Sequence, residues 1–82
     1  MTIYVATDRN DNNRVITAST SKVTCAWAIV EFLERSYTED EWNEFLTEDG
    51  YLSNEDMVRN IVAGMDDVLN KFKMGIQAFE DK

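Results

Sequence analysis

The segment from Thr2 to Ala18 reads TIYVATDRNDNNRVITA, and it decides the fold class. Two runs rich in β-branched and aromatic residues, residues 2–7 and 14–18, enclose six residues of turn chemistry. Runs of this composition favour strands, and a polar turn between two of them predicts a β-hairpin. Because the sequence after the hairpin has helical periodicity, we predict an α+β fold that begins with this hairpin.

The turn between the two strands resembles the start of a calcium loop. Asp8, Asn10 and Asn12 match its first, third and fifth positions. The loop also requires a glycine at position six and a glutamate at position twelve, where this chain has Asn13 and Ser19. Asn and Asp side chains bond their own backbone in turns and tolerate left-handed conformations. We therefore predict a polar hairpin turn and no metal site.

Two helices are expected after the hairpin, at residues 21–35 and 39–47. The first is apolar around most of its circumference, which is typical of a helix enclosed on more than one side. We place it between the hairpin and the later helices. The second begins at a capping box formed by Thr38 and Glu41, and it turns Trp42 inward.

A third helix, long and amphipathic, is predicted at residues 54–80. When successive residues are placed 100° apart, ten apolar side chains fall within a stripe about 140° wide: Met57, Val58, Ile61, Val62, Met65, Val68, Leu69, Phe72, Ile76 and Phe79. Because the stripe keeps its phase across Gly64 and Gly75, one continuous helix is favoured. Lys71 and Lys73 ahead of Gly75 indicate an alternative helix end there.

The length of that helix predicts an exposed apolar end. About 27 helical residues span about 40 Å, whereas a compact body of 82 residues is about 30 Å across. Phe72, Ile76 and Phe79 would overhang the body and need a cover, which would be the hairpin, a second copy or a target protein. These three residues are therefore candidates for the interface of a homodimer.

Composition predicts a single intracellular domain. The 82 residues are 44% hydrophobic, typical of one folded domain over residues 1–82. Cys25 is the only cysteine, which excludes an internal disulfide and, with no secretion signal at the start, fits the reducing cytoplasm. The longest apolar run, residues 25–30, is far shorter than the roughly 20 residues that span a bilayer, so no membrane contact is expected.

The residues that carry most enzymatic chemistry are missing. The chain has no histidine, and its three glycines stand alone at positions 50, 64 and 75, so there is no phosphate loop. Cys25 lies on an apolar helix and is interpreted as a packing residue. The acidic run of residues 39–41 is explained by the dipole of a capped helix. We predict neither enzymatic activity nor a cofactor.

Negative charge is concentrated in the middle of the chain. Between Glu31 and Asp56 there are ten acidic residues and one base, Arg35, a net charge of −9. The other six acids and seven bases leave +1, which accounts for the total of −8. An acidic surface of this kind repels nucleic-acid phosphates, so no direct nucleic-acid binding is expected, whereas it complements a basic protein surface.

Two functions from different classes follow. The first is a small acidic binding protein that inhibits or regulates a basic-surfaced partner through six residues: Glu34, Asp40, Glu41, Glu44, Glu48 and Asp49. In its sharpest form the carboxylates mimic the phosphates of DNA. In size and charge only, the chain looks like phage-encoded accessory proteins that inhibit host nucleases or other nucleic-acid enzymes. The second function is a homo-oligomeric structural or regulatory module. An acidic face that only aids solubility is the structural alternative.

Overall fold

The chain begins with the predicted hairpin. In the computed structural model, which describes residues 1–80, β1 (Thr2–Asp8) pairs antiparallel with β2 (Arg14–Ser19). A short 3-10 helix, η1 (Arg9–Asp11), and two asparagines connect them, and Asn12 and Asn13 have φ angles of 55° and 59°. Asparagine adopts this left-handed conformation more readily than most residues, because its short polar side chain bonds locally. Both predicted strands and the polar turn between them are present.

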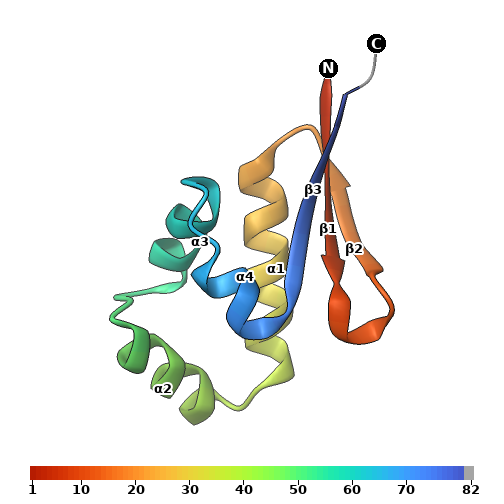
Figure 1. Cartoon of the computed structure of the whole chain (residues 1–82). Helices are drawn as coiled ribbons and strands as arrows, with labels where there is room; N and C mark the ends of the chain where they lie inside the picture. Colours follow the sequence, from red (N-terminus) through yellow and green to blue (C-terminus); the bar gives the residue numbers. More distant parts are fainter. Residues whose placement is uncertain (81–82) are drawn as a thin grey trace.

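The first helix lies between two layers, as expected. α1 (Lys22–Ser36) begins after Ser21, whose hydroxyl accepts a hydrogen bond from the Thr24 backbone N–H at 3.3 Å. It contacts the strands on one side and α3 (Asn54–Val62) on the other (Figure 1). Its buried residues are Cys25, Ala26, Ile29, Val30 and Leu33.

The second helix begins at the predicted capping box. α2 (Glu39–Asp49) follows Thr38, whose hydroxyl accepts from the Glu41 backbone N–H at 3.2 Å. The Glu41 carboxylate in turn accepts from the Thr38 backbone N–H at 3.0 Å. Two of the orphan donors at the helix start are thereby satisfied. The helix ends at Gly50, which has a φ of 78°.

The C-terminal third of the chain differs from the predicted single helix over residues 54–80, and this prediction is wrong. α3 ends at Val62, a second short helix, α4 (Asp67–Phe72), follows it, and the chain continues as a strand, β3 (Met74–Glu80). None of the helices within residues 1–80 combines the length and the apolar character needed to cross a membrane.

Gly64 is the reason that α3 ends. Its φ is +85°, its backbone N–H donates to the Ile61 carbonyl at 3.1 Å, and the Met65 N–H donates to the Asn60 carbonyl at 3.0 Å. These two bonds make the Schellman motif, in which a left-handed residue ends the helix. The apolar stripe continues across Gly64 because the stripe depends only on the spacing of apolar residues in the sequence. It contains no information about the backbone angles at which a helix ends.

α4 ends at Lys73, which has a φ of 54°. The alternative end ahead of Gly75 is thus the correct one. β3 then pairs antiparallel with β1 along its whole length, from Asp8–Met74 to Thr2–Glu80. The sheet order is β2-β1-β3, so the first strand is central and receives its second partner from the other end of the chain.

Within residues 1–80, the α-helices cover one face of the sheet. Ala6 is fully buried, and its partner Ile76 packs against the core. Because side chains alternate along a strand, Ile3, Val5 and Thr7 point to the other face. In Figure 1, α1, α2, α3 and α4 all lie on one side of the sheet, and Ala6 belongs to the core that they form with it.

Candidate partner-binding surface

Ring contacts hold α2 to the rest of the molecule. The Phe45 ring makes edge contacts with Tyr37 and Phe72, with centroids 5.0 and 5.2 Å apart. Trp42 is buried, its ring lies 6.0 Å from that of Phe72, and its indole N–H donates to Asn54 Oδ1 at 2.7 Å. Such aromatic pairs stabilise beyond the area they bury. We call Tyr37, Trp42, Phe45 and Phe72 the aromatic cluster, and it fixes the orientation of α2.

The side of α2 that faces away from the cluster carries three carboxylates. Asp40, Glu44 and Glu48 are all exposed, and none of them makes a hydrogen bond or ion pair with another residue of 1–80. Residues four apart lie on one side of a helix, about 6 Å apart along its axis. We call these three residues the α2 ridge, and its length is about 12 Å.

Two of the other predicted site residues have structural roles. The Glu34 carboxylate accepts from Asn54 Nδ2 at 2.9 Å, which extends the hydrogen-bonded chain that starts at Trp42. Glu41 belongs to the capping box, and hydrogen bonds from the backbone and hydroxyl of Thr38 lower the pKa of its carboxyl. Their carboxylates therefore already serve the fold.

The sixth predicted residue, Asp49, forms an ion pair across two helices. Its carboxylate accepts from Lys71 Nζ at 2.8 Å, and this bond raises the pKa of Lys71. The ammonium also lies 5.0 Å from the centroid of the Phe45 ring. The pair thus joins the end of α2 to α4 beside the aromatic cluster. Of the six predicted acids, the structure brings three together as an unpaired surface.

The structure separates the three residues predicted for an oligomer interface. Phe72 is 6% exposed and lies in the core, where it belongs to the aromatic cluster. Ile76 is half-buried and packs against the core from β3. Phe79 is 52% exposed. The overhanging helix that was to present them does not exist, and only Phe79 lies open to a partner.

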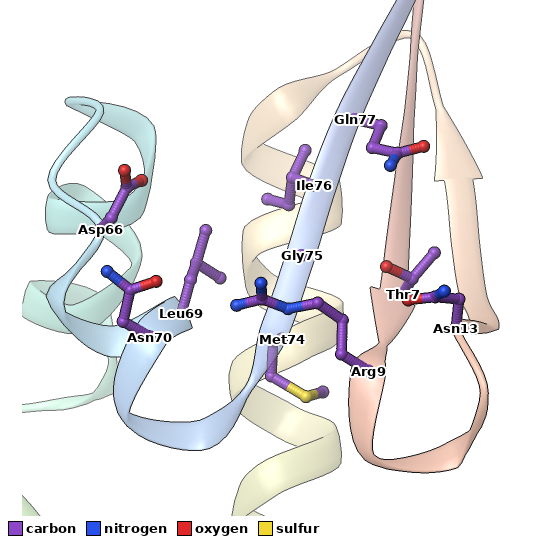
Figure 2. A pocket seen from close by; sticks show the side chains of 10 residues that line it. All are labelled: Thr7, Arg9, Asn13, Asp66, Leu69, Asn70, Met74, Gly75, Ile76 and Gln77. Atoms are coloured by element: carbon purple, nitrogen blue, oxygen red, sulfur yellow. The ribbon is translucent and has the colours of Figure 1, made fainter.

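Sequence reasoning missed a hollow of about 280 Å³ beside the lower half of β3 (Figure 2). Its polar lining comes from the hairpin, α4 and β3: Thr7, Arg9, Asn13, Asp66, Asn70 and Gln77. The Arg9 side chain lies across Gly75 in Figure 2, and a Cβ at Gly75 would stand 3.1 Å from Thr7 Oγ1 and 3.9 Å from Arg9 Cδ. A glycine inside a strand indicates such a close approach. That signal was hidden because this strand was interpreted as a helix.

A second hollow, of about 330 Å³, lies between α1 and α3. Apolar side chains make up most of its lining: Val23, Trp27, Val58, Val62 and Ala63. The ion pair between Arg59 and Glu55, at 2.8 Å, borders it. The apolar part of this lining accepts a hydrophobic group, and charged groups occur only at its border, at Glu55 and Arg59.

The oxygens of the hairpin turn bond to the protein itself. Asp8 Oδ1 accepts from the Asn10 backbone N–H at 2.9 Å and from Asn10 Nδ2 at 3.1 Å. Asn10 Nδ2 also donates to the Phe72 carbonyl at 2.9 Å, which ties the turn to the end of α4. Within residues 1–80, no group of three or more acidic, histidine or cysteine side chains is placed to hold a metal ion.

The single cysteine is a core residue. Cys25 is fully buried, its Sγ lies 3.4 Å from the Tyr4 carbonyl oxygen, and burial raises the pKa of its thiol. A thiol that is both buried and harder to ionise is a poor nucleophile.

In comparisons with protein families, curated proteins and solved structures, nothing matched this chain. Function is therefore inferred from the surface itself.

Proposed function

We propose that this chain is a non-catalytic binding protein that inhibits or regulates a partner with a basic surface, and that the α2 ridge is its contact surface. One observation carries the proposal: Asp40, Glu44 and Glu48 are aligned and exposed, and none of them makes a hydrogen bond or ion pair within residues 1–80, although, after the hydrogen bond to Asp49, the charge of Glu48 helps to raise the pKa of Lys71. The helix that bears them is fixed by the aromatic cluster. Because the helix backbone is fixed, binding has to order only the three side chains and not the segment that carries them, which favours affinity.

The charge of the whole chain supports the same proposal. The net charge of −8 lies mainly in the segment that contains α2. A surface field of one sign speeds association with an oppositely charged partner and suppresses association with acidic ones. Each exposed ion pair contributes about 0.2–1 kcal/mol, so three ridge contacts add specificity and on-rate more than they add affinity.

The chemistry of the chain favours binding over catalysis. There is no histidine to act as a general base near neutral pH. The one thiol, at Cys25, is buried. Regulation would therefore act by occupying the surface of the partner.

A narrower form of the proposal is a phage-type inhibitor that mimics DNA. One strand of a duplex presents a phosphate every 3.4 Å or so along the axis, so about 12 Å of ridge spans three to four phosphates. The ridge offers three carboxylates over that length. It therefore approximates the charge of one strand, and a nuclease or another nucleic-acid enzyme with a narrow basic groove is the partner class that fits.

The test uses two variants with equal net charge. Asp40→Lys with Glu44→Lys reverses the ridge, whereas Glu31→Lys with Asp66→Lys reverses two exposed acids that lie outside α2. Proteins captured by the wild type from the native host lysate are identified by mass spectrometry. The affinity of each variant for the captured partner is then measured at low and high salt.

We expect the ridge variant to bind the partner about 30-fold more weakly, since reversing two charges removes about 2 kcal/mol. The control variant should bind within a few-fold of the wild type, and wild-type affinity should fall as salt rises. Equal losses of affinity in both variants would show that only net charge matters, and would refute the α2 ridge as the contact surface. For the DNA-mimic form, duplex DNA should displace the partner; binding unaffected by DNA would exclude it.

The sequence also predicted a homo-oligomeric module, and one observation favours it as a second candidate function. Phe79 is 52% exposed, and its pairing with Ile3 places it on the face of the sheet opposite the core residue Ala6.

A further inference from the structure

β3 lies at an edge of the sheet and bonds to a neighbour on one side only, because the strand order is β2-β1-β3. The Arg9 N–H donates to the Lys73 carbonyl at 3.0 Å, which adds one bonded pair to the ladder between β1 and β3. Bonded pairs recur at every second residue of an antiparallel ladder. Counted from Lys73, the residues of β3 that bond to β1 are therefore Gly75, Gln77 and Phe79.

The backbone groups of Ile76 and Ala78 consequently point away from β1. Neither residue makes a hydrogen bond on that side with any other residue of 1–80. We call this side of the strand the open edge of β3. A row of N–H and C=O groups without partners is a template for pairing with another strand.

The open edge lacks the features that normally prevent such pairing, which are prolines, lysines and bulges. β2, at the other edge of the sheet, has a register shift opposite Ala6 and Thr7. β3 instead pairs with β1 over seven residues without a shift. It contains neither lysine nor proline, and its only charged residue is Glu80 at its end. Of the two edges, β3 is therefore better suited to accept an added strand.

A hollow lies along the open edge. The space of about 280 Å³ in Figure 2 is lined by four consecutive residues of β3, which are Met74, Gly75, Ile76 and Gln77. Successive side chains of a strand point to opposite faces of the sheet. A hollow that touches all four must extend past the edge on both faces. An added strand would enter this hollow with its backbone against Ile76.

The two walls of the hollow carry opposite charges. Arg9 reaches it from the face opposite the core, where a Cβ at Gly75 would stand 3.9 Å from Arg9 Cδ. Asp66 and Asn70 reach it from the α4 side (Figure 2). The side chains of Arg9, Asp66 and Asn70 are exposed and make no hydrogen bond or ion pair with any other residue of 1–80. One hollow thus holds a cation and an anion that do not pair with each other.

We propose that the open edge of β3 binds an extended segment of another protein as a fourth strand of the sheet, with a basic residue of the segment at Asp66 and the adjacent acidic residue at Arg9. In strand addition, main-chain bonds supply affinity and alternate side chains supply specificity. A residue of the segment opposite Ile76 points to the Asp66 side, and its neighbour in the segment points to the Arg9 side. The Arg9 side chain can turn aside for the strand, because exposed side chains change rotamer within nanoseconds.

Charge selects another protein over a second copy as the source of the strand. If two copies paired their β3 strands antiparallel, the residues with open backbone groups would stand opposite one another, on the Asp66 side. These residues are Met74, Ile76, Ala78 and Glu80. A second copy therefore brings one acid and no base toward Asp66, and its net charge of −8 adds repulsion. A segment in which a base adjoins an acid complements both walls.

Two threonine-rich peptides of equal composition, about as long as the seven residues of β3, test this alternation. In one, a lysine and a glutamate are adjacent; in the other, one residue separates them, so both point to the same side. We expect the adjacent peptide to bind with a dissociation constant of about 10–500 µM. It should bind about threefold more tightly than the spaced peptide, which can satisfy only one wall.

Hydrogen exchange with water, measured by nuclear magnetic resonance, locates the added strand. The amides of Ile76 and Ala78 should exchange more slowly when the adjacent peptide is bound, because each gains a hydrogen-bond acceptor. The Gln77 amide already bonds to β1 and should change little. This alternation along one strand distinguishes strand addition from binding on either face of the sheet.

Ala78→Pro removes an open N–H and no bond to β1, a substitution that edge strands tolerate. It should weaken peptide binding at least tenfold, whereas the matched control Ala78→Val keeps the N–H and should bind within about threefold of the wild type. Asp66→Lys should weaken binding of the adjacent peptide about fivefold. Circular dichroism checks that every variant is folded.

Unchanged exchange at Ile76 and Ala78 with both peptides at about 1 mM, or undiminished binding to Ala78→Pro, would overturn the proposal. Slower exchange that grows with protein concentration in the absence of peptide would make a second copy the occupant and would overturn the choice of another protein.

The open edge and the α2 ridge are separate contact surfaces, and their failures are distinguishable. The ridge variant Asp40→Lys with Glu44→Lys should bind the adjacent peptide like the wild type. Among proteins captured from the lysate, one that is lost by the Glu31→Lys with Asp66→Lys variant but kept by the ridge variant would bind at the open edge.

Discussion

Replacing Phe72 with alanine tests whether the aromatic cluster holds α2 to the molecule. Phe72 is 6% exposed and contacts the rings of Tyr37, Trp42 and Phe45. Truncating a buried phenylalanine costs about 3–5 kcal/mol. A chain of 82 residues has a total stability of roughly 4–12 kcal/mol. Phe72→Ala is therefore expected to lower Tm by roughly 15–30 °C, or to leave α2 detached from a folded remainder.

Urea unfolding followed by two signals separates these outcomes. Far-ultraviolet circular dichroism reports all helices. Tryptophan fluorescence, measured in a Trp27→Phe background because α1 carries the second tryptophan, reports the cluster through Trp42, whose ring lies 6.0 Å from that of Phe72. If only α2 detaches, fluorescence changes before circular dichroism. Hydrogen exchange should then be faster in α2 than in β1, which is the central strand.

Phe79→Ala is the matched control, because it removes the same ring from a site that is 52% exposed. Measured at a concentration where the chain is monomeric, its free energy of unfolding should change by less than about 1 kcal/mol. Equal losses for the two variants, or a loss below about 1 kcal/mol for Phe72→Ala, would refute the role given to the cluster.

Thr38→Ala removes the hydroxyl of the capping box and should lower the free energy of urea unfolding by about 1 kcal/mol. Hydrogen bonds from Thr38 lower the pKa of Glu41 in the folded state. The stability that the ionised Glu41 contributes is therefore fully present above its unfolded-state pKa and is lost as pH falls through its folded-state pKa. Glu41→Gln should lose less free energy of unfolding in acid than the wild type does. Gly64→Ala should cost about 1 kcal/mol, because φ is +85° there although no atom within 4 Å would meet the added Cβ, and Gly64→Asn should cost less. The Cys25 thiol should react with a thiol reagent only as fast as the protein opens, since it is buried with a raised pKa; fast reaction in the native state would contradict this.

The N-terminal half of the fold was predictable because its signals are local. β-branched runs on either side of a polar turn indicate a hairpin without knowledge of the rest of the chain. The capping box at Thr38 and Glu41 similarly determines where α2 begins, within a few residues of the sequence. The apolar circumference of α1 indicated that it would be enclosed, and its contacts with the sheet and α3 show this.

The C-terminal half was not predictable by the same means. Gly64 and Lys73 end two helices through left-handed backbone angles, which leave no trace in an apolar period. β3 exists because β1 offers it a free edge, and Thr2 and Glu80, which pair there, stand at opposite ends of the described chain. A pattern of Met74, Ile76 and Phe79 is compatible with a helix until that long-range partner is known.

The surface features show the same difference between local and long-range signals. The α2 ridge follows from residues four apart on one helix, so the sequence alone indicates it. Arg9 and Gly75 meet only because β1 and β3 are neighbours, and the hollow between them depends on that pairing. Phe72 was predicted to lie at an oligomer interface, but it is buried and anchors α2 inside the molecule.

The place of β1 at the centre of the sheet also constrains how the chain folds during synthesis. β1 leaves the ribosome before the other described elements and β3 leaves after them, so the sheet stays a two-stranded hairpin until the end of β3 emerges. Contacts of such high sequence separation slow folding, because a long loop must close before they form. Until then the free edge of β1 is available to any other strand. The nascent chain is thus at greatest risk of pairing wrongly just before its last strand arrives, and a rare-codon pause ahead of Met74 should increase the aggregated fraction.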